Sequence, residues 1–287
     1  MDIEVTKNCA GLPDSHIHTK YSFDSELEPV CHVEDAIRLG LCSITFTDHV
    51  DIVTEGMVLD EGNTCETWND GTVLGSIDAA RSLNGAHPEL EVLAGVELGQ
   101  AAFPEARAQA EHVLSLADLD FVLGSMHLMH CGTDYYYVDY TLPENDPYEI
   151  YACYLDDIYE LVRWGKIDCL AHLTYPLRYI IGQSGVDFDD RRFDGNYDRI
   201  LRLLADDGKA LEINTSGARR ANGFMLPDTR LVARFRELGG KYITLGSDAH
   251  HKGHLGAGLE TGAKMAKEAG FDSVVFYREH RPTAVRI

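Results

Sequence analysis

The strongest constraint on the fold is a pattern that recurs along most of the 287-residue chain: a short apolar run, a polar loop, and a segment whose apolar residues have helical spacing. Runs typical of strands occupy residues 12–18, 43–47, 90–96, 121–125, 167–171, 210–213 and 242–245. Helical patterns follow at residues 28–39, 73–83, 104–116, 147–164, 197–206, 227–238 and 258–269, and residues 273–277 form a last short strand. Alternating strands and helices indicate a parallel sheet or barrel. Seven such units predict an α/β fold, a (βα)7 barrel one unit short of a TIM barrel, with residues 1–287 as a single domain.

Composition disfavours several classes of protein. The chain has 47 acidic and 25 basic residues and a net charge of −22, which argues against binding to nucleic acid or to an anionic membrane. No apolar run approaches the roughly 20 residues of a membrane-spanning helix. Residues 1–11 contain acids where a secretory signal has a hydrophobic stretch, so the expected location is the cytoplasm. The seven cysteines include no C-x-x-C pair, which disfavours a disulfide framework and a zinc knuckle.

Imidazole and carboxylate groups stand where the strand-like runs end. They are His16, His18, His49, Glu97, His127, His172, Asp248 and His250. His16 and His18 are two residues apart, so both rings point to the same face of a strand. The carboxyl ends of barrel strands meet at one rim, where active sites are built, so these groups are expected to converge there. Imidazole and carboxylate ligands suit zinc, iron or manganese, and the absence of cysteine argues against a thiolate site.

The number of these groups indicates more than one ion. A catalytic zinc commonly takes three protein ligands and a water, so this set implies two or three divalent ions, with Glu97 able to bridge. Clustered ions are typical of phosphoester hydrolysis, because they hold the phosphoryl group and generate hydroxide at neutral pH. Taken alone, His49 or His172 would more often be a core or surface residue. Convergence at six strand ends favours a metal site.

The remaining histidines and Asp24 carry less information. His32, His87, His112 and His280 are expected to face solvent or to cap helices and turns, and His130, His251 and His254 to be loop residues. Asp24 lies in a loop six residues after His18. On residue type alone, a metal ligand and a plain loop acid are equally good interpretations of Asp24.

Together these residues resemble the motifs of the polymerase and histidinol phosphatase (PHP) superfamily, in order and spacing across nearly the whole chain. The matching motifs are Asp14-x-His16-x-His18, Thr47-Asp48-His49, the isolated His127 and His172, and Ser247-Asp248-Ala249-His250. The resemblance implies a distorted seven-stranded (βα)7 TIM-like barrel with a trinuclear metal centre at its C-terminal rim.

Within the superfamily the chain is most similar to the HisK-type histidinol-phosphate phosphatases, in Tyr21-Ser22-Phe23-Asp24-Ser25 and in Leu211-Glu212-Ile213-Asn214-Thr215-Ser216-Gly217. The branch of nucleotide 3′-phosphatases fits less well, because Val50-Asp51 follows His49. The resemblance makes Asp24 a metal ligand and implies nine in all: His16, His18, Asp24, His49, Glu97, His127, His172, Asp248 and His250.

The implied reaction is hydrolysis of L-histidinol phosphate, a step of histidine biosynthesis, by in-line attack of a metal-bound hydroxide on phosphorus. Two alternatives stay open. The same chemistry on another small phosphate ester, such as a nucleotide or a sugar phosphate, is the first. A non-catalytic metal-binding module is the second, and the complete set of ligands counts against it.

Other residues are expected to assist. Arg178 and Arg219, in the loops after His172 and Asn214, are candidates for phosphate contacts, because arginine can bind oxyanions through two N–H groups. Arg220 in place of Arg219 stays open, as does the interpretation of these arginines as surface residues. Asp14, Asp48 and Ser247 are expected to orient the histidines. Loop residues 50–71 and 135–140 are expected to receive the ammonium and imidazole of the substrate, and no general acid is assigned.

Overall fold

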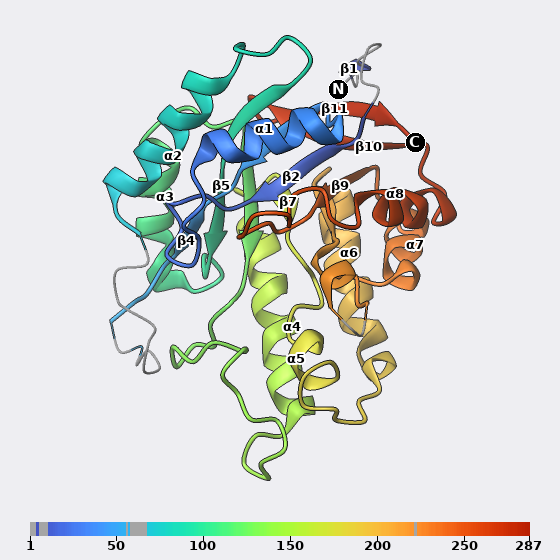
Figure 1. Cartoon of the computed structure of the whole chain (residues 1–287). Helices are drawn as coiled ribbons and strands as arrows, with labels where there is room; N and C mark the ends of the chain where they lie inside the picture. The colour runs from blue at the N-terminus through green and yellow to red at the C-terminus, as the bar shows by residue number, and fades with distance from the viewer. Residues whose placement is uncertain (1–3, 6–10, 56, 58–67, 221–222) are drawn as a thin grey trace.

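A computed structural model of the chain describes residues 4–5, 11–55, 57, 68–220 and 223–287 (Figure 1). Seven parallel strands follow one another around a nearly closed barrel, which confirms the predicted fold. In order they are β2 (Pro13–Ile17), β3 (Ser43–Phe46), β5 (Glu91–Gly99), β6 (Phe121–Ser125), β7 (Cys169–Leu170), β8 (Ala210–Asn214) and β9 (Tyr242–Gly246).

The barrel closes between β2 and the segment that follows β9. The backbone N–H of Asp248 donates to the carbonyl of His16 (2.8 Å), and that of His18 donates to the carbonyl of Ala249 (2.9 Å). Ile17 forms a parallel bridge with Ala249 between these two bonds. The first and last histidine motifs of the chain therefore lie side by side at the rim.

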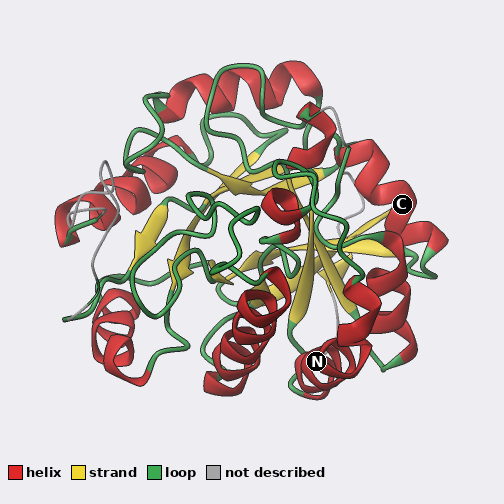
Figure 2. Cartoon of the chain, turned by 90° about the horizontal axis from the view of Figure 1, so that it is seen from below, coloured by secondary structure: helices red, strands yellow, loops and turns green. Residues whose placement is uncertain are grey.

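Helices surround the strands on the outside of the barrel (Figure 2). The longer ones are α1 (Pro29–Leu39), α2 (Asp70–Leu83), α3 (Arg107–Ser115), α4 (Pro147–Trp164), α6 (Asp194–Asp206), α7 (Thr229–Glu237) and α8 (Leu259–Glu268). Short turns occupy loops: η1 (Pro104–Ala106), α5 (Leu177–Ile180), η2 (Asp190–Phe193) and η3 (Ser216–Arg219). The helix boundaries follow local chemistry: α1 has Pro29 in its first turn and ends at Gly40, whose φ of 70° suits glycine.

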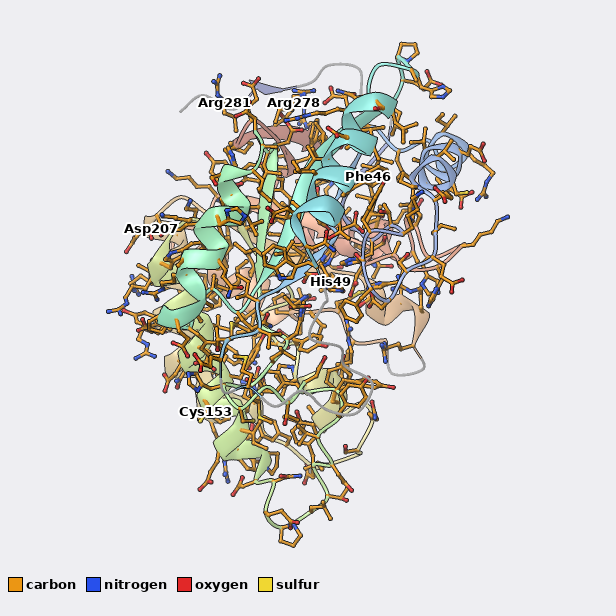
Figure 3. All side chains as sticks on the ribbon, turned by 90° about the vertical axis from the view of Figure 1, so that its left-hand side faces the viewer. Phe46, His49, Cys153, Asp207, Arg278 and Arg281 are labelled. Atoms are coloured by element: carbon orange, nitrogen blue, oxygen red, sulfur yellow. The ribbon has the colours of Figure 1, made fainter. Side chains whose placement is uncertain are left out.

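A hairpin closes the end of the barrel opposite the rim. β10 (Ser273–Arg278) pairs with β11 (Arg281–Arg286), and β1 (Glu4–Val5) adds to β11. Val275, Tyr277 and Ala284 of the hairpin form a separate apolar cluster with Phe121, Leu123, Cys169, Ala171 and Ala210. Several of these residues begin their strands, so the hairpin covers the amino ends of the strands. Figure 3 accordingly shows Arg278 and Arg281 at one end of the molecule, well away from His49.

Three details differ from the sequence predictions. β4 (His49–Asp51) pairs with the outer half of β5, where a loop over residues 50–71 was expected. This pairing extends β5 to Gly99, so Glu97 stands inside a strand and not at its end. β11 was not predicted. Of the expected loop, residues 56 and 58–67 lie outside the described residues. No helix in the described ranges is long and apolar enough to cross a membrane.

Candidate metal centre

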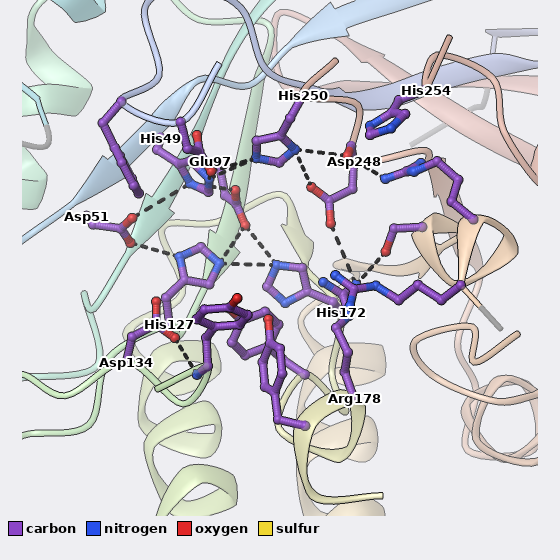
Figure 4. Close-up of a pocket in the computed structure, with 18 of the residues that line it drawn as sticks. His49, Asp51, Glu97, His127, Asp134, His172, Arg178, Asp248, His250 and His254 are labelled. Carbon is purple, nitrogen blue, oxygen red and sulfur yellow. Dashed lines mark hydrogen bonds and ion pairs between the residues drawn. The ribbon is translucent and has the colours of Figure 1, made fainter. Parts of the chain in front are cut away.

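The carboxylate of Glu97 lies at the centre of the rim, on β5, and is buried. Five histidine nitrogens surround its two oxygens, and Figure 4 shows three of these histidines, His49, His127 and His172. Oε1 lies 2.8 Å from Nε2 of His172 and 3.1 Å from Nε2 of His127, and Oε2 lies 3.0 Å from Nδ1 of His49, 3.1 Å from Nε2 of His16 and 3.5 Å from Nε2 of His18. Burial alone would raise the pKa of Glu97, but these imidazoles hold the pKa well below its ordinary value. The group is therefore an ionised carboxylate.

A second set of groups adjoins this centre. Nε2 of His250 lies 3.0 Å from Oδ2 of Asp24, and Nε2 of His49 lies 3.7 Å from the same oxygen. Oδ1 of Asp248 lies 3.6 Å from Nε2 of His18 and 3.3 Å from Nδ1 of His250. The structure thus brings together all nine side chains that the resemblance implies as metal ligands. Asp24, ambiguous from its residue type, is among them.

The geometry of the nitrogens fits a bound cation. Nε2 of His127 lies 3.3 Å from Nε2 of His172, and Nε2 of His49 lies 3.4 Å from Nε2 of His250. Two such lone pairs repel each other unless a proton or a metal ion lies close to both. Four overlapping groups of three His, Asp or Glu side chains have ligand atoms within 4.8 Å of one another among the described residues. Three ligands of these types suffice for a catalytic zinc.

The environment of His18 also fits a bound metal ion. Its Nε2 is buried and has no hydrogen-bond partner among the residues that the structure describes. Burial, with His250 and His49 close by, lowers the pKa of His18 well below its ordinary value. The ring is therefore neutral, which is the form that binds a metal.

Ser22 determines which nitrogen of His18 faces the centre. The hydroxyl of Ser22 donates to Asp48 (2.7 Å) and accepts from the backbone N–H of His49 (3.0 Å). A hydroxyl has one proton to donate, so Nδ1 of His18, 3.1 Å from Ser22 Oγ, must be the donor in that contact. The lone pair of His18 then lies on Nε2, toward the centre.

Asp48 supports this arrangement from below. It also accepts from the backbone N–H and the hydroxyl of Thr19 (2.6 and 2.8 Å) and from the hydroxyl of Ser76 on α2 (2.6 Å). Asp48 is buried, and these hydrogen bonds from protein donors replace the water that its carboxylate would have in solution. Its influence on the histidines acts through Ser22 and through the backbone.

Glu212 is a member of the site that sequence reasoning missed. It is fully buried on β8, with Oε1 2.6 Å from Nδ1 of His16 and Oε2 accepting from the backbone N–H of His172 (2.7 Å). The contact with His16 leaves Nε2 of that ring for the centre, and the contact with His172 fixes the end of β7. A carboxylate of this kind is the usual outer partner of a metal-binding histidine.

Asp51 is the second missed residue and does the same for His127. Its Oδ1 lies 2.9 Å from Nδ1 of His127, whose Nε2 faces Glu97. Asp51 stands on β4, two residues after His49. Asp51 could have been predicted from the two-residue spacing that puts it on the same face of a strand as His49, as with His16 and His18. It was missed because residues 50–71 were interpreted as a loop.

Two glycines make room for these acids. A Cβ at Gly246 would lie 2.3 Å from Oε1 of Glu212 and 2.4 Å from Cβ of His16. A Cβ at Gly99 would lie 2.1 Å from Oδ1 of Asp51. Neither approach is compatible with a side chain, so each glycine is the space into which a neighbouring strand places a carboxylate.

The loop after β9 is held by residues for which other roles were expected. Asp14 accepts from the backbone N–H groups of Ser247 (2.8 Å) and Gly256 (3.0 Å). Arg219 donates to the carbonyls of Ser247 (2.6 Å) and Asp248 (2.9 Å). Asp248 has a φ of 55°, an unusual conformation that these bonds stabilise. Arg219 therefore has a positioning contact in addition to its place at the pocket.

His32 corrects an expectation. It is buried, not solvent-facing, and its Nε2 lies 2.9 Å from the carbonyl of His18. The contact steadies the backbone of the first histidine motif from α1. The prediction was wrong because α1 presents this residue to the barrel.

A pocket of about 590 Å³ opens above the centre. Arg178, Arg219, Arg220 and His254 line it near β8 and β9. Arg178 is buried, donates to the hydroxyl of Ser216, and lies 3.7 Å from Oδ2 of Asp248. Asp134 and several tyrosines line the side near His127 (Figure 4). The volume is within the range of small-molecule sites.

Comparison with known proteins places the chain in a family. The family model for the PHP domain matches residues 14–216, so the chain belongs to the PHP domain family. It is 29% identical over 273 residues to the probable histidinol-phosphatase of Clostridium acetobutylicum, covering 92% of this chain and 96% of that protein. It is 28% identical over 280 residues to the histidinol-phosphatase of Lactococcus lactis subsp. lactis, covering 92% and 93%.

A solved structure is similar as well. The crystal structure of histidinol phosphate phosphatase from Lactococcus lactis subsp. lactis, complexed with zinc, L-histidinol and phosphate, has a TM-score of 0.74 and 26% identity, over 94% of this chain and 98% of that chain. The resemblance to the PHP superfamily inferred from the sequence motifs is confirmed.

Glu212→Gln is expected to weaken metal binding about 10- to 100-fold. The amide offers one acceptor where the carboxylate offers two, so His16 or the backbone of His172 loses its partner. Competition with a chelator measures the affinity, and circular dichroism checks the fold. The matched control is Glu268→Gln, at an exposed position on α8. Equal affinities for Glu212→Gln and the unchanged protein would contradict the role given to Glu212.

Gly246→Ala is expected to lower metal content and to destabilise the fold by about 1–3 kcal/mol, because the new methyl group overlaps Glu212 and His16. Elemental analysis gives the metal per chain, and urea unfolding gives the free energy. Gly195→Ala is the control: it lies in α6 with open space around the added atom, and is expected to be neutral or slightly stabilising. Full metal content in the Gly246 variant would show that the space is not needed.

Proposed function

We propose that the chain is a metal-dependent phosphatase that hydrolyses L-histidinol phosphate to L-histidinol and inorganic phosphate. The observation that carries the proposal is the convergence of nine histidine and carboxylate side chains beneath a pocket that arginines also line. The similarity to histidinol-phosphatases over more than nine tenths of the chain supports the choice of substrate.

The proposed ligands are His16, His18, Asp24, His49, Glu97, His127, His172, Asp248 and His250, and they would hold two or three ions of zinc, iron or manganese. Glu97 has nitrogens around both of its oxygens and is the proposed bridge. When bound, the ions supply positive charge for the phosphoryl oxygens and lower the pKa of water. Ser22, Asp51 and Glu212 keep the ligand nitrogens turned inward.

Arg178 is the proposed protein contact for the phosphate. Its guanidinium is buried at the pocket wall, where it lies next to Asp248 and Ser216. A buried arginine is always charged and offers several N–H groups to an oxyanion. Arg219 already uses two nitrogens on backbone carbonyls, so it and Arg220 are proposed as additional charge at the same wall.

Phosphate release from a panel of esters tests the function. Protein loaded with Zn²⁺, Mn²⁺ or Fe²⁺ is expected to hydrolyse L-histidinol phosphate in preference to AMP and glucose 6-phosphate. A chelator should abolish the activity, and added metal should restore it. If AMP or glucose 6-phosphate is the preferred ester, the protein is still a phosphatase but L-histidinol phosphate is the wrong substrate. Absence of turnover on every ester by metal-loaded protein would favour a non-catalytic metal-binding role.

Arg178→Ala is expected to reduce kcat/KM for L-histidinol phosphate about 10- to 100-fold, which corresponds to the loss of charge-assisted hydrogen bonds. Metal content should stay unchanged, because Arg178 is not among the proposed ligands. Arg281→Ala, at an exposed position on the hairpin, is the control. Normal kinetics in the Arg178→Ala variant would show that Arg178 does not contact the phosphate.

A further inference from the structure

The pocket above the metal centre has two walls of opposite character. Arg178, Arg219 and Arg220 line the wall near β8 and β9. Asp134 lines the pocket on the other side, beside His127, whereas Arg178 lies beyond His172 (Figure 4). A phosphate group is attracted to the first wall. The second wall repels it and attracts a cation.

A tight turn after β6 fixes the position of Asp134. The backbone N–H of Met129 donates to the carbonyl of Thr133 (2.8 Å), Leu128 forms a bridge with Asp134, and Gly132 adopts a φ of 97°. Oδ1 of Asp134 accepts from the backbone N–H of Tyr136 (2.8 Å). This carboxylate is therefore tied to the segment after β6 that also carries His127.

Asp134 has no partner of opposite charge within ion-pair distance among the residues described here. Asp24, Asp51 and Asp248 each lie beside a histidine nitrogen, but the carboxylate of Asp134 accepts its hydrogen bond from a backbone amide. Burial raises the pKa of Asp134 to about 6, which reflects a carboxylate short of compensating charge. A cation in the pocket would supply that charge.

Tyr175 lies between the two walls, because the guanidinium carbon of Arg178 is 5.6 Å from the centre of its ring. From Tyr175, aromatic rings continue through Tyr179 to Tyr136 and Tyr137, as the distances between ring centres show. Tyr175 lies 5.0 Å from His172, Tyr179 lies 5.1 Å from Tyr175, Tyr136 lies 5.4 Å from Tyr179, and Tyr137 lies 4.9 Å from Tyr136. Tyr136 and Tyr137 are 45% and 51% exposed, although both are large aromatic side chains. Ring faces of this kind attract cations and stack on flat rings.

We propose that Asp134, Tyr136 and Tyr137 form a subsite for the positively charged, non-reacting end of the phosphate ester. The inference rests on the proposed function, since it assigns one end of a phosphate ester to each wall. The substrate then lies across the centre with its phosphate toward Arg178 and its cation toward Asp134. Contacts with the cationic end hold the ester in place and reject esters that lack the charge.

The test compares two esters of similar size that differ in charge, O-phosphoethanolamine and propyl phosphate. Calorimetry measures their binding to metal-loaded protein, which requires no turnover. The unchanged protein is expected to bind the ammonium ester on the order of 10-fold more tightly or better. Asp134→Asn should remove this preference and leave the binding of propyl phosphate and the metal content unchanged. Asp139→Asn, an exposed acid of the same loop, should keep the preference.

Kinetics on L-histidinol phosphate provide the second measurement. For Asp134→Asn, kcat/KM is expected to fall about 10- to 100-fold, chiefly through KM, because contacts with a distant cation act on the bound substrate and the transition state alike.

The outcomes separate this inference from the proposed function. If neither protein prefers the ammonium ester, or if the Asp134 variant keeps the preference, the subsite is wrong even when L-histidinol phosphate is a good substrate. If the preference exists and is lost in the variant while L-histidinol phosphate is not hydrolysed, the subsite stands and the proposed substrate is wrong. An equal loss on both esters would assign Asp134 to the metal centre instead.

Discussion

The site depends on one carboxylate, that of Glu97, held among five imidazole nitrogens inside a barrel. A buried carboxylate is stable only when its lost solvation is replaced. The histidines replace it here, and they arrive from β2, from β4 and from the segments after β6 and β7. Glu97 can occupy this position because β4 extends the pairing of β5, which carries the glutamate up to the rim. The pairing of β4 with β5 therefore places the charge of Glu97, and the surrounding strands supply the histidines that stabilise that charge.

Contacts outside the centre decide which nitrogen of each histidine ring faces Glu97. An imidazole has two nitrogens, and the partner of one decides what the other offers. Glu212 takes Nδ1 of His16, Asp51 takes Nδ1 of His127, and Ser22 takes Nδ1 of His18. Each contact leaves Nε2 toward Glu97. The barrel thus supplies histidines whose orientation is set before any ion binds.

The repeating pattern of strands and helices was sufficient to predict the barrel, because each apolar run has the length of a strand and is followed by a segment with helical spacing. The residues at the ends of these runs could be found for the same reason, since parallel strands deliver their carboxyl ends to one rim. Asp24 required the resemblance to a family, because its loop has no periodicity that locates it. The designation of particular residues as ligands remains a prediction.

The members of the site that the sequence concealed share a physical cause. Glu212 alternates with Leu211 and Ile213, a pattern that a strand with one solvated face also produces, and only closure of the barrel puts the polar side inside. Asp51 fell in a segment with too few residues to indicate a strand, and β4 forms there because β5 offers it a partner. β11 was also not predicted, and it forms because the predicted strand β10 offers it a partner. Tertiary pairing decides these three cases.

The missing side chains of Gly99 and Gly246 leave the volume that the carboxylates of Asp51 and Glu212 occupy. Any attempt to transplant this centre into another barrel would begin with the ligand side chains, and a recipient with alanine at either glycine position would accept all of them. It would still lack the volume in which the outer acids lie, and its histidines would be free to turn. The two absent side chains belong to the description of the site as much as the residues that fill it.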